Sequence, residues 1–322
     1  MRKLIVLALL GAFALAALAA MPASGKTPGQ NGRIAFARND PADTEGETFT
    51  YTANPDGSDV RALFPAFHSS DPHWSPDGSE VAVLSGLGQE CPPTCTGNTV
   101  IIDPDTGDYR VLASQGFPAV ETFCSLWSPD ATHFVCEGGN DEDSSVHGLY
   151  TIRSSDGGGL TRLTDAQGGD DIPIDFSPDG KEIVFGRFDV PGRPPRANSA
   201  LFVVASDGGA ERRITPWGFA DNAGSWSPDG TKIAFEHLGS LFTVHPDGTG
   251  LAKLPLDLDG RSFAGDVDWS PDGEAIVFLS ITQTGAHSFD EGLATANADG
   301  GDVRQMTSSP TFDHLADWGR IP

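Results

Sequence analysis

The sequence predicts an all-β protein: a six-bladed β-propeller in which each blade contains four strands. Three observations lead to this prediction. A Trp-Ser-Pro-Asp-Gly motif returns at intervals of 43 to 53 residues, a second turn signal follows each copy, and one further copy is divided between the two ends of the chain. Repeats of this length are typical of propellers and other arrays, in which each unit buries its faces against its neighbours.

Each repeat begins with a hairpin. Proline presets φ at the first corner of the turn, aspartate tolerates the second corner, and glycine adopts the left-handed conformation that follows. Alternating apolar residues on both sides of the turn predict two strands. The five copies are HWSPDGSEVAV, LWSPDATHFVC, DFSPDGKEIVF, SWSPDGTKIAF and DWSPDGEAIVF, and their aromatic residues are Trp74, Trp127, Phe176, Trp226 and Trp269.

Each repeat continues with a second hairpin, as in LFVVASDGGAERRIT and LFTVHPDGTGLAKL. Four short strands in one repeat match one propeller blade. The stretch Asp103–Asp108 has the acidic spacing of part of a calcium loop, but it falls where this second turn belongs. Turn chemistry therefore accounts for it better than calcium binding does.

The two ends of the chain supply the sixth blade. The C-terminal HLADWGRIP provides Trp318, which follows Trp269 by 49 residues, and NGRIAFAR provides the end of the turn and the next strand. Pairing of these terminal strands would close the ring and remove two exposed sheet edges. We therefore expect a single six-bladed propeller over residues 26–322.

This repeat resembles the TolB-type, WD-like propeller family, which also includes the non-catalytic propellers of prolyl oligopeptidase and dipeptidyl peptidase relatives. The resemblance rests on the Ser-Pro-Asp-Gly turns at 75–78, 177–180, 227–230 and 270–273, and it spans residues 31–318. TolB carries an additional α/β domain and the peptidases carry a hydrolase domain. We expect neither domain here, so the partners and catalysis of those relatives are not carried over.

The first 25 residues have the layout of a secretory signal peptide. Two basic residues precede an apolar run from Leu4 to Ala20, and small residues follow, with cleavage expected after Ala19 or Gly25. An uncleaved membrane anchor is the alternative. No later segment approaches the roughly 18 apolar residues of a membrane span. We therefore expect an exported monomer, periplasmic or extracellular, with no membrane span in the mature chain.

The chain is strongly acidic, with 45 Asp and Glu residues against 20 Lys and Arg residues and a formal net charge of −25. This charge repels phosphate backbones and anionic membranes, so we expect no nucleic-acid partner. It is compatible with divalent cations and with basic partners.

Long connections predict where a partner would bind. The tight Ser-Pro-Asp-Gly and Asp-Gly turns share one face of the propeller, whereas segments such as 38–48, 88–98 and 186–199 lie on the opposite, loop-rich face. The repeat that begins at Trp226 has only a short link near Leu238, which predicts a notch in that rim. Long loops on a rigid scaffold typically carry binding sites. We therefore expect a protein or glycan partner on this face.

The residues before each aromatic are predicted to line the upper channel. Carboxylates that converge on an axis suit Ca²⁺, which prefers oxygen ligands. Asp171, Asp221 and Asp266 are the candidate calcium ligands; a water-filled channel and a site for a small polar ligand are the alternatives. The full candidate set is Asp71, Glu121, Asp171, Asp221, Asp266, Asp313 and His314.

Motifs of catalysis are absent from the sequence: it contains no Gly-x-Ser-x-Gly elbow and no His-Glu-x-x-His. Two channel carboxylates could still act as a glycosidase pair, which requires a separation of roughly 5–10 Å. The leading prediction is a non-enzymatic binding protein. The alternative is an envelope hydrolase or lyase that uses channel carboxylates, with or without a metal.

Four cysteines in an exported chain favour disulfides. In the copy CSLWSPDATHFVC, a three-residue loop would pair Ser128 with Thr132 and place Cys124 opposite Cys136, within disulfide distance. Ala131 replaces the turn glycine there, and its left-handed conformation costs on the order of 1 kcal/mol. We expect disulfides Cys124–Cys136 and Cys91–Cys95; the alternatives join the Cys91 and Cys95 loop to the next blade.

Overall fold

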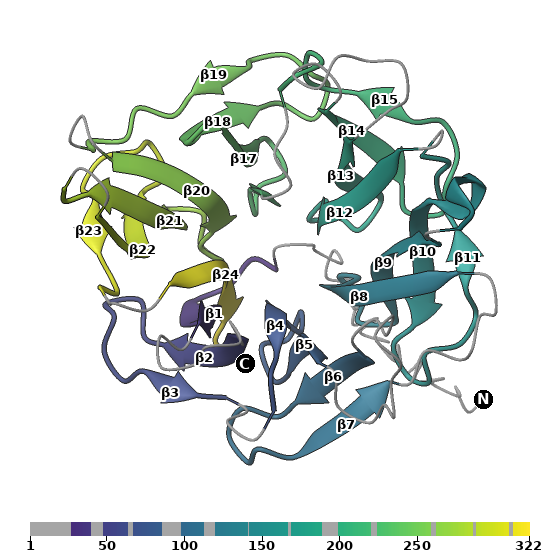
Figure 1. Cartoon of the computed structure of the whole chain (residues 1–322), viewed down its shortest axis with the longest axis horizontal. Helices are drawn as coiled ribbons and strands as arrows, with labels where there is room; N and C mark the ends of the chain where they lie inside the picture. Colours follow the sequence, from purple (N-terminus) through teal and green to yellow (C-terminus); the bar gives the residue numbers. More distant parts are fainter. Residues whose placement is uncertain are drawn as a thin grey trace, which may run out of the picture.

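The chain folds into six four-stranded antiparallel sheets around a central axis, as the sequence predicts (Figure 1). Each sheet is one blade, and its first strand lies nearest the axis. Among the described residues, no helix is long and apolar enough to cross a membrane. The computed structural model describes residues 27–39, 48–63, 67–85, 98–112, 120–140, 142–166, 169–188, 199–219, 224–258, 262–285, 288–308 and 312–322.

From the axis outward, the first three blades contain the following strands. Blade one has β24 (Asp313–Arg320), β1 (Asn31–Asn39), β2 (Thr48–Ala53) and β3 (Arg61–Ala62). Blade two has β4 (Ser70–Trp74), β5 (Val81–Ser85), β6 (Asn98–Ile102) and β7 (Tyr109–Leu112). Blade three has β8 (Glu121–Trp127), β9 (His133–Gly139), β10 (Gly148–Arg153) and β11 (Thr161–Arg162), with the short 3₁₀ helix η1 (Ser144–Val146) before β10.

The other three blades follow the same order. Blade four has β12 (Asp170–Phe176), β13 (Glu182–Phe188), β14 (Ala200–Ala205) and β15 (Arg212–Arg213). Blade five has β16 (Gly224–Trp226), β17 (Ile233–His237), β18 (Ser240–Val244) and β19 (Ala252–Lys253). Blade six has β20 (Ser262–Trp269), β21 (Ala275–Gln283), β22 (Phe289–Asn297) and β23 (Arg304–Gln305).

The two ends of the chain close the ring within blade one, which confirms the split repeat. Strand β24 pairs with β1 so that Trp318 lies opposite Ile34. The backbone N–H of Ile321 also donates to the Gln30 carbonyl at 2.9 Å. The closing blade is therefore held by main-chain bonds between segments almost 300 residues apart in the chain.

Each Ser-Pro-Asp-Gly turn is stabilised by its own side chains. In blade two, the Ser75 hydroxyl donates to Asp77 Oδ1 at 2.7 Å, and the same oxygen accepts the Ser79 N–H at 3.0 Å. Gly78 has a φ of 79°, which is the left-handed conformation that the motif predicts. The repeated tetrapeptide therefore specifies its turn through contacts within the turn itself.

The hydrophobic core lies between the blades. One cluster combines Trp226, Ile233 and Phe235 of blade five with Ile174 and Val184 of blade four, all of them buried. Other clusters join further neighbouring blades in the same way. Since each blade buries its apolar faces only against its neighbours, the ring is stabilised as a whole.

The hairpin of blade three carries the predicted disulfide Cys124–Cys136, and the two cysteines are directly opposed in the register of β8 and β9. The expected three-residue loop is wrong: the Ser128 N–H donates to the His133 carbonyl at 2.8 Å, so the loop has four residues. A one-residue bulge at Ser125 offsets the longer loop and keeps the cysteines opposed. Ala131 takes the left-handed conformation, with φ of 58°. Cys91 and Cys95 lie outside the described residues.

Replacing both bridging cysteines, by Cys124→Ala and Cys136→Ala, should lower the free energy of unfolding by about 3 kcal/mol. This estimate follows from the chain entropy released when a cross-link over 12 residues is removed. Urea denaturation of the oxidised wild type and the double variant measures the difference. A loss below about 0.5 kcal/mol would contradict a stabilising role for the bridge.

Candidate functional site

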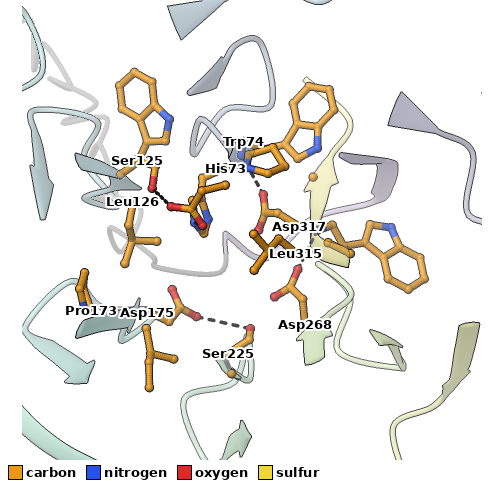
Figure 2. A pocket seen from close by; sticks show the side chains of 18 of the residues that line it. His73, Trp74, Ser125, Leu126, Pro173, Asp175, Ser225, Asp268, Leu315 and Asp317 are labelled. Carbon is orange, nitrogen blue, oxygen red and sulfur yellow. Dashed lines mark hydrogen bonds and ion pairs between the residues drawn. The ribbon is translucent and has the colours of Figure 1, made fainter. Parts of the chain in front are cut away.

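A cavity of about 510 Å³ lies on the axis of the ring, between the first strands of all six blades (Figure 2). Its wall is mixed. Leu126, Pro173 and Leu315 provide apolar surface, whereas Asp71 and Asp266 provide carboxylates. Cavities of this size with a few polar groups are the usual form of ligand sites. This axial cavity is therefore the candidate ligand site.

Three aspartates in this wall bond the next blade. Each stands directly before the aromatic residue of its repeat, and one carboxylate oxygen accepts the backbone N–H of the following blade's tryptophan. Figure 2 labels the three aspartates at the cavity wall. We call these three contacts the inter-blade bonds. They join Asp175 to Trp226 at 2.7 Å, Asp268 to Trp318 at 2.6 Å, and Asp317 to Trp74 at 2.7 Å.

The same position differs in the other three blades. Ser225 replaces aspartate in blade five, and its hydroxyl accepts the Trp269 N–H at 3.4 Å, a longer contact. Blades two and three have His73 and Leu126 there. In blade three the neighbouring Ser125 donates its hydroxyl hydrogen bond to Asp71 of blade two instead (Figure 2). Blade three is thus joined to blade two through a different pair.

Of the predicted channel residues in the described part of the chain, Asp71 and Asp266 line the cavity. Both adopt the left-handed conformation, with φ of 52° and 41°, at bulges in β4 and β20. Aspartate tolerates this conformation better than most residues do. Asp266 accepts the Leu315 N–H at 3.3 Å, and burial raises the pKa of its carboxyl above the ordinary value.

The pKa values of His73 and Glu137, two further groups in the cavity wall, are displaced from their ordinary values. Burial lowers the pKa of His73, but Asp71, at 3.6 Å, together with Asp317 and Asp175, raises it to about 9. His73 is therefore charged at neutral pH. Burial and the charges of Asp170 and Asp71 raise the pKa of Glu137 to about 7. Sequence reasoning missed both residues: His73 directly precedes Trp74 but was interpreted only as flanking a turn, and Glu137 lies on the second strand of its blade, away from the positions before the aromatic.

Asp171 and Asp313 do not line the cavity, and their expected placement is wrong. Each lies directly opposite an arginine on the next strand and forms a two-point ion pair with it, at 2.6 and 2.7 Å: Asp171 with Arg187, and Asp313 with Arg38. Arg187 is only 2% exposed. Opposed residues of unlike charge on paired strands attract each other, which turns these carboxylates away from the axis.

The calcium site stays a prediction, and at Asp171 both carboxylate oxygens already accept from Arg187, while one also accepts from Thr164. Asp221, another candidate ligand, lies outside the described residues. Among the residues that the structure describes, no group of three or more His, Cys, Asp or Glu side chains has the arrangement of a metal site.

Glu121 and His314 also lie away from the cavity wall. Glu121 is exposed at the start of β8. His314 contacts Asn39 Oδ1 through its Nε2 at 3.0 Å and stacks on Phe312, and burial lowers its pKa. The cavity is therefore lined by Asp71, Asp266, His73 and Glu137 together with the three aspartates of the inter-blade bonds, and only Asp71 and Asp266 belong to the predicted set.

Comparisons with known proteins place this geometry among TolB structures. TolB from Acinetobacter baumannii superposes with a TM-score of 0.65 at 21% identity, covering 90% of this chain and 67% of that protein. The putative TolB from Agrobacterium tumefaciens gives 0.62 at 19% identity, covering 91% of this chain and all of that protein. The fold is that of a TolB-type propeller. At these identities the similarity shows the fold alone.

Two further similarities concern a lyase structure and a sequence relative. An oligogalacturonate lyase in complex with manganese gives a TM-score of 0.52 at 17% identity, covering 87% of this chain and 75% of the lyase. In sequence, the chain is 26% identical over 238 residues to the uncharacterized protein Atu1656 of Agrobacterium fabrum, covering 70% of this chain and 74% of that protein. No protein-family profile matches the sequence.

The raised pKa of His73 predicts a loss of stability in alkali. A histidine whose pKa rises on folding stabilises the native state fully below the unfolded value of about 6.5, and this contribution disappears as the pH rises through about 9. Between pH 6 and pH 10 the wild type should therefore lose roughly 3 kcal/mol more than His73→Gln does. Urea unfolding at both pH values measures this, and an NMR titration of the His73 ring below pH 6.5 would contradict it.

Proposed function

We propose that this chain is an exported, non-enzymatic propeller that binds a protein or glycan through its loop-rich face. The proposal rests on one observation: most acidic side chains of the innermost strands bond other residues of the ring. Asp175, Asp268 and Asp317 bond the next blade, and Asp171 and Asp313 bond arginines of their own blades. Since these carboxylates serve the ring, recognition is left to the face with the long connections.

The difference between the two faces supports this assignment. On one face, the first and second strands of blades two to six are joined by five or six residues, such as 75–80, whose polar groups bond within the turn. On the opposite face, the second and third strands of blades two and four are joined by 86–97 and 189–199. Tight, internally bonded turns offer little variable surface, whereas long connections on a rigid ring do.

Export is part of the same proposal. Residues 1–25 would act as a cleaved signal peptide, and the mature chain would be a monomer in the periplasm or outside the cell. The Cys124–Cys136 disulfide supports this location, because such bonds persist in oxidising compartments.

An envelope hydrolase or lyase is the second candidate, and one observation favours it. Asp71 and Glu137 line the same cavity with pKa values displaced in opposite directions. Burial alone would raise the pKa of Asp71, but His73 and Ser125 hold it below its ordinary value, whereas Glu137 titrates near 7. Carboxyls displaced in this way are typical of acid and base pairs. The oligogalacturonate lyase that shares the fold suggests the first substrate to test.

The double variant Asp71→Asn/Glu137→Gln separates the two functions. If the chain is a binding protein, cross-linked capture of partners from the native envelope and medium, and binding to a glycan array, should equal those of the wild type. If it is an enzyme, turnover of oligogalacturonate should fall about 10²–10⁴-fold, the usual contribution of general acid–base catalysis.

The matched control is Asp105→Asn/Glu274→Gln, which removes the same two charges from exposed turns away from the cavity. Equal melting temperatures of both variants would show that the ring is intact. Wild-type turnover that disappears only in the cavity variant would contradict the non-enzymatic proposal.

A further inference from the structure

Blade five is shorter than blade six on the loop-rich side. Strands β17 and β18 have five residues each and are joined by the two-residue turn Leu238-Gly239, so the notch expected from the sequence is present. Strands β21 and β22 have nine residues each (Figure 1). Counted from the equivalent Phe235 and Phe278, β21 extends three residues further than β17, about 10 Å. The rim therefore has a step between these blades.

Two large apolar side chains are exposed at this step. Leu238 is 81% exposed and Phe263, at the start of β20, is 47% exposed. They belong to one surface, because the Ala264 N–H donates to the Gly239 carbonyl at 3.1 Å and a Cβ on Gly239 would lie 2.7 Å from the Phe263 ring. We call the surface of Leu238 and Phe263 the apolar step.

The backbone of Leu238 is strained. Its φ is 49°, and Gly239 follows at 71°, so both turn residues are left-handed. Two-residue turns of this type favour asparagine or glycine at the first position, and a branched, bulky residue there is an outlier. Leucine thus replaces a better turn residue at a site where its side chain is largely exposed to solvent. Strain that folding does not require indicates a role in recognition.

Acidic side chains surround the apolar step. Glu236 accepts the Gly239 N–H at 3.3 Å, and a Cβ on Gly265 would lie 2.6 Å from its Oε2. Glu291 stands in the same row of the sheet as Phe263, since both lie opposite Ile281. At the strand spacing this row places the two residues about 10 Å apart, close to the screening length of physiological salt. A partner that docks here meets negative charge beside apolar surface.

We propose that the apolar step binds a protein segment in which a large apolar side chain is flanked by lysine or arginine. This rests on the proposed binding role of the loop-rich face and specifies the partner as a protein. A leucine that protrudes from a tight turn suits insertion between apolar side chains, whereas glycans are recognised through flat rings and hydrogen-bonding groups. Complementary charge would raise the association rate and make binding sensitive to salt.

The test uses the mature protein as bait on an array of random twelve-residue peptides. Wild-type protein should enrich peptides with a central Leu, Phe or Trp next to basic residues. Leu238→Asn should weaken the best peptide at least tenfold and leave the melting temperature unchanged or raised, because asparagine suits the left-handed turn. Phe263→Ser should weaken the same peptide. Val60→Asn, which removes a 41% exposed apolar residue elsewhere, should have no effect.

Three outcomes would overturn the inference. They are enrichment of acidic or uncharged peptides, binding that Leu238→Asn leaves intact, and no enrichment of any peptide. If no peptide binds while a glycan array retains the protein, the partner at the apolar step is not a protein, and the broader binding proposal stands. A fall in melting temperature for Leu238→Asn would show that leucine serves the fold, which also overturns the inference.

Discussion

The ring depends on the bond from an inner-strand carboxylate to the tryptophan N–H of the next blade. The first strand of each blade presents one backbone edge to the axis, and among the described strands none pairs with that edge. Asp175, Asp268 and Asp317 occupy three of these edges with an acceptor from the preceding blade. Hydrogen bonds to a charged group contribute about 1.5–3 kcal/mol each, so the same carboxylates satisfy the edge and hold adjacent blades in register.

Blade three shows what replaces this bond. His73 of blade two and Leu126 of blade three occupy the positions at which other blades have the bonding aspartate. Blade three therefore neither receives an inter-blade bond from blade two at this position nor forms one to blade four. The blade instead has the Cys124–Cys136 cross-link and the Ser125–Asp71 hydrogen bond, and the bulge at Ser125 serves both. The unusual cysteines and the alanine turn of this repeat therefore belong to one hairpin, in which a covalent bond stabilises strands joined by a strained turn residue.

The fold could be predicted because the repeated turn is specified by a few adjacent residues and because the split repeat implies ring closure. The residues that line the channel could not be predicted, because counting residues back from the aromatic ignores β-bulges and ion pairs with the neighbouring strand. Bulges at Asp71 and Asp266 aim those carboxylates into the cavity, whereas Arg187 and Arg38 draw Asp171 and Asp313 away from it. The signal for the inter-blade bonds was present in the sequence, as the aspartate directly before Phe176, Trp269 and Trp318. The disulfide Cys124–Cys136 was predicted correctly although its loop was not, since two single-residue errors cancelled.

Hydrogen exchange of individual backbone amides tests the central role of the inter-blade bonds most directly. The amides of Trp74, Trp226 and Trp318 should exchange only through global unfolding, because each donates to a carboxylate of the preceding blade. For Trp127 of blade three, the preceding blade has His73 in place of the bonding aspartate. The Trp127 amide should therefore exchange faster, through local opening. Equal exchange rates for all four amides would contradict the account.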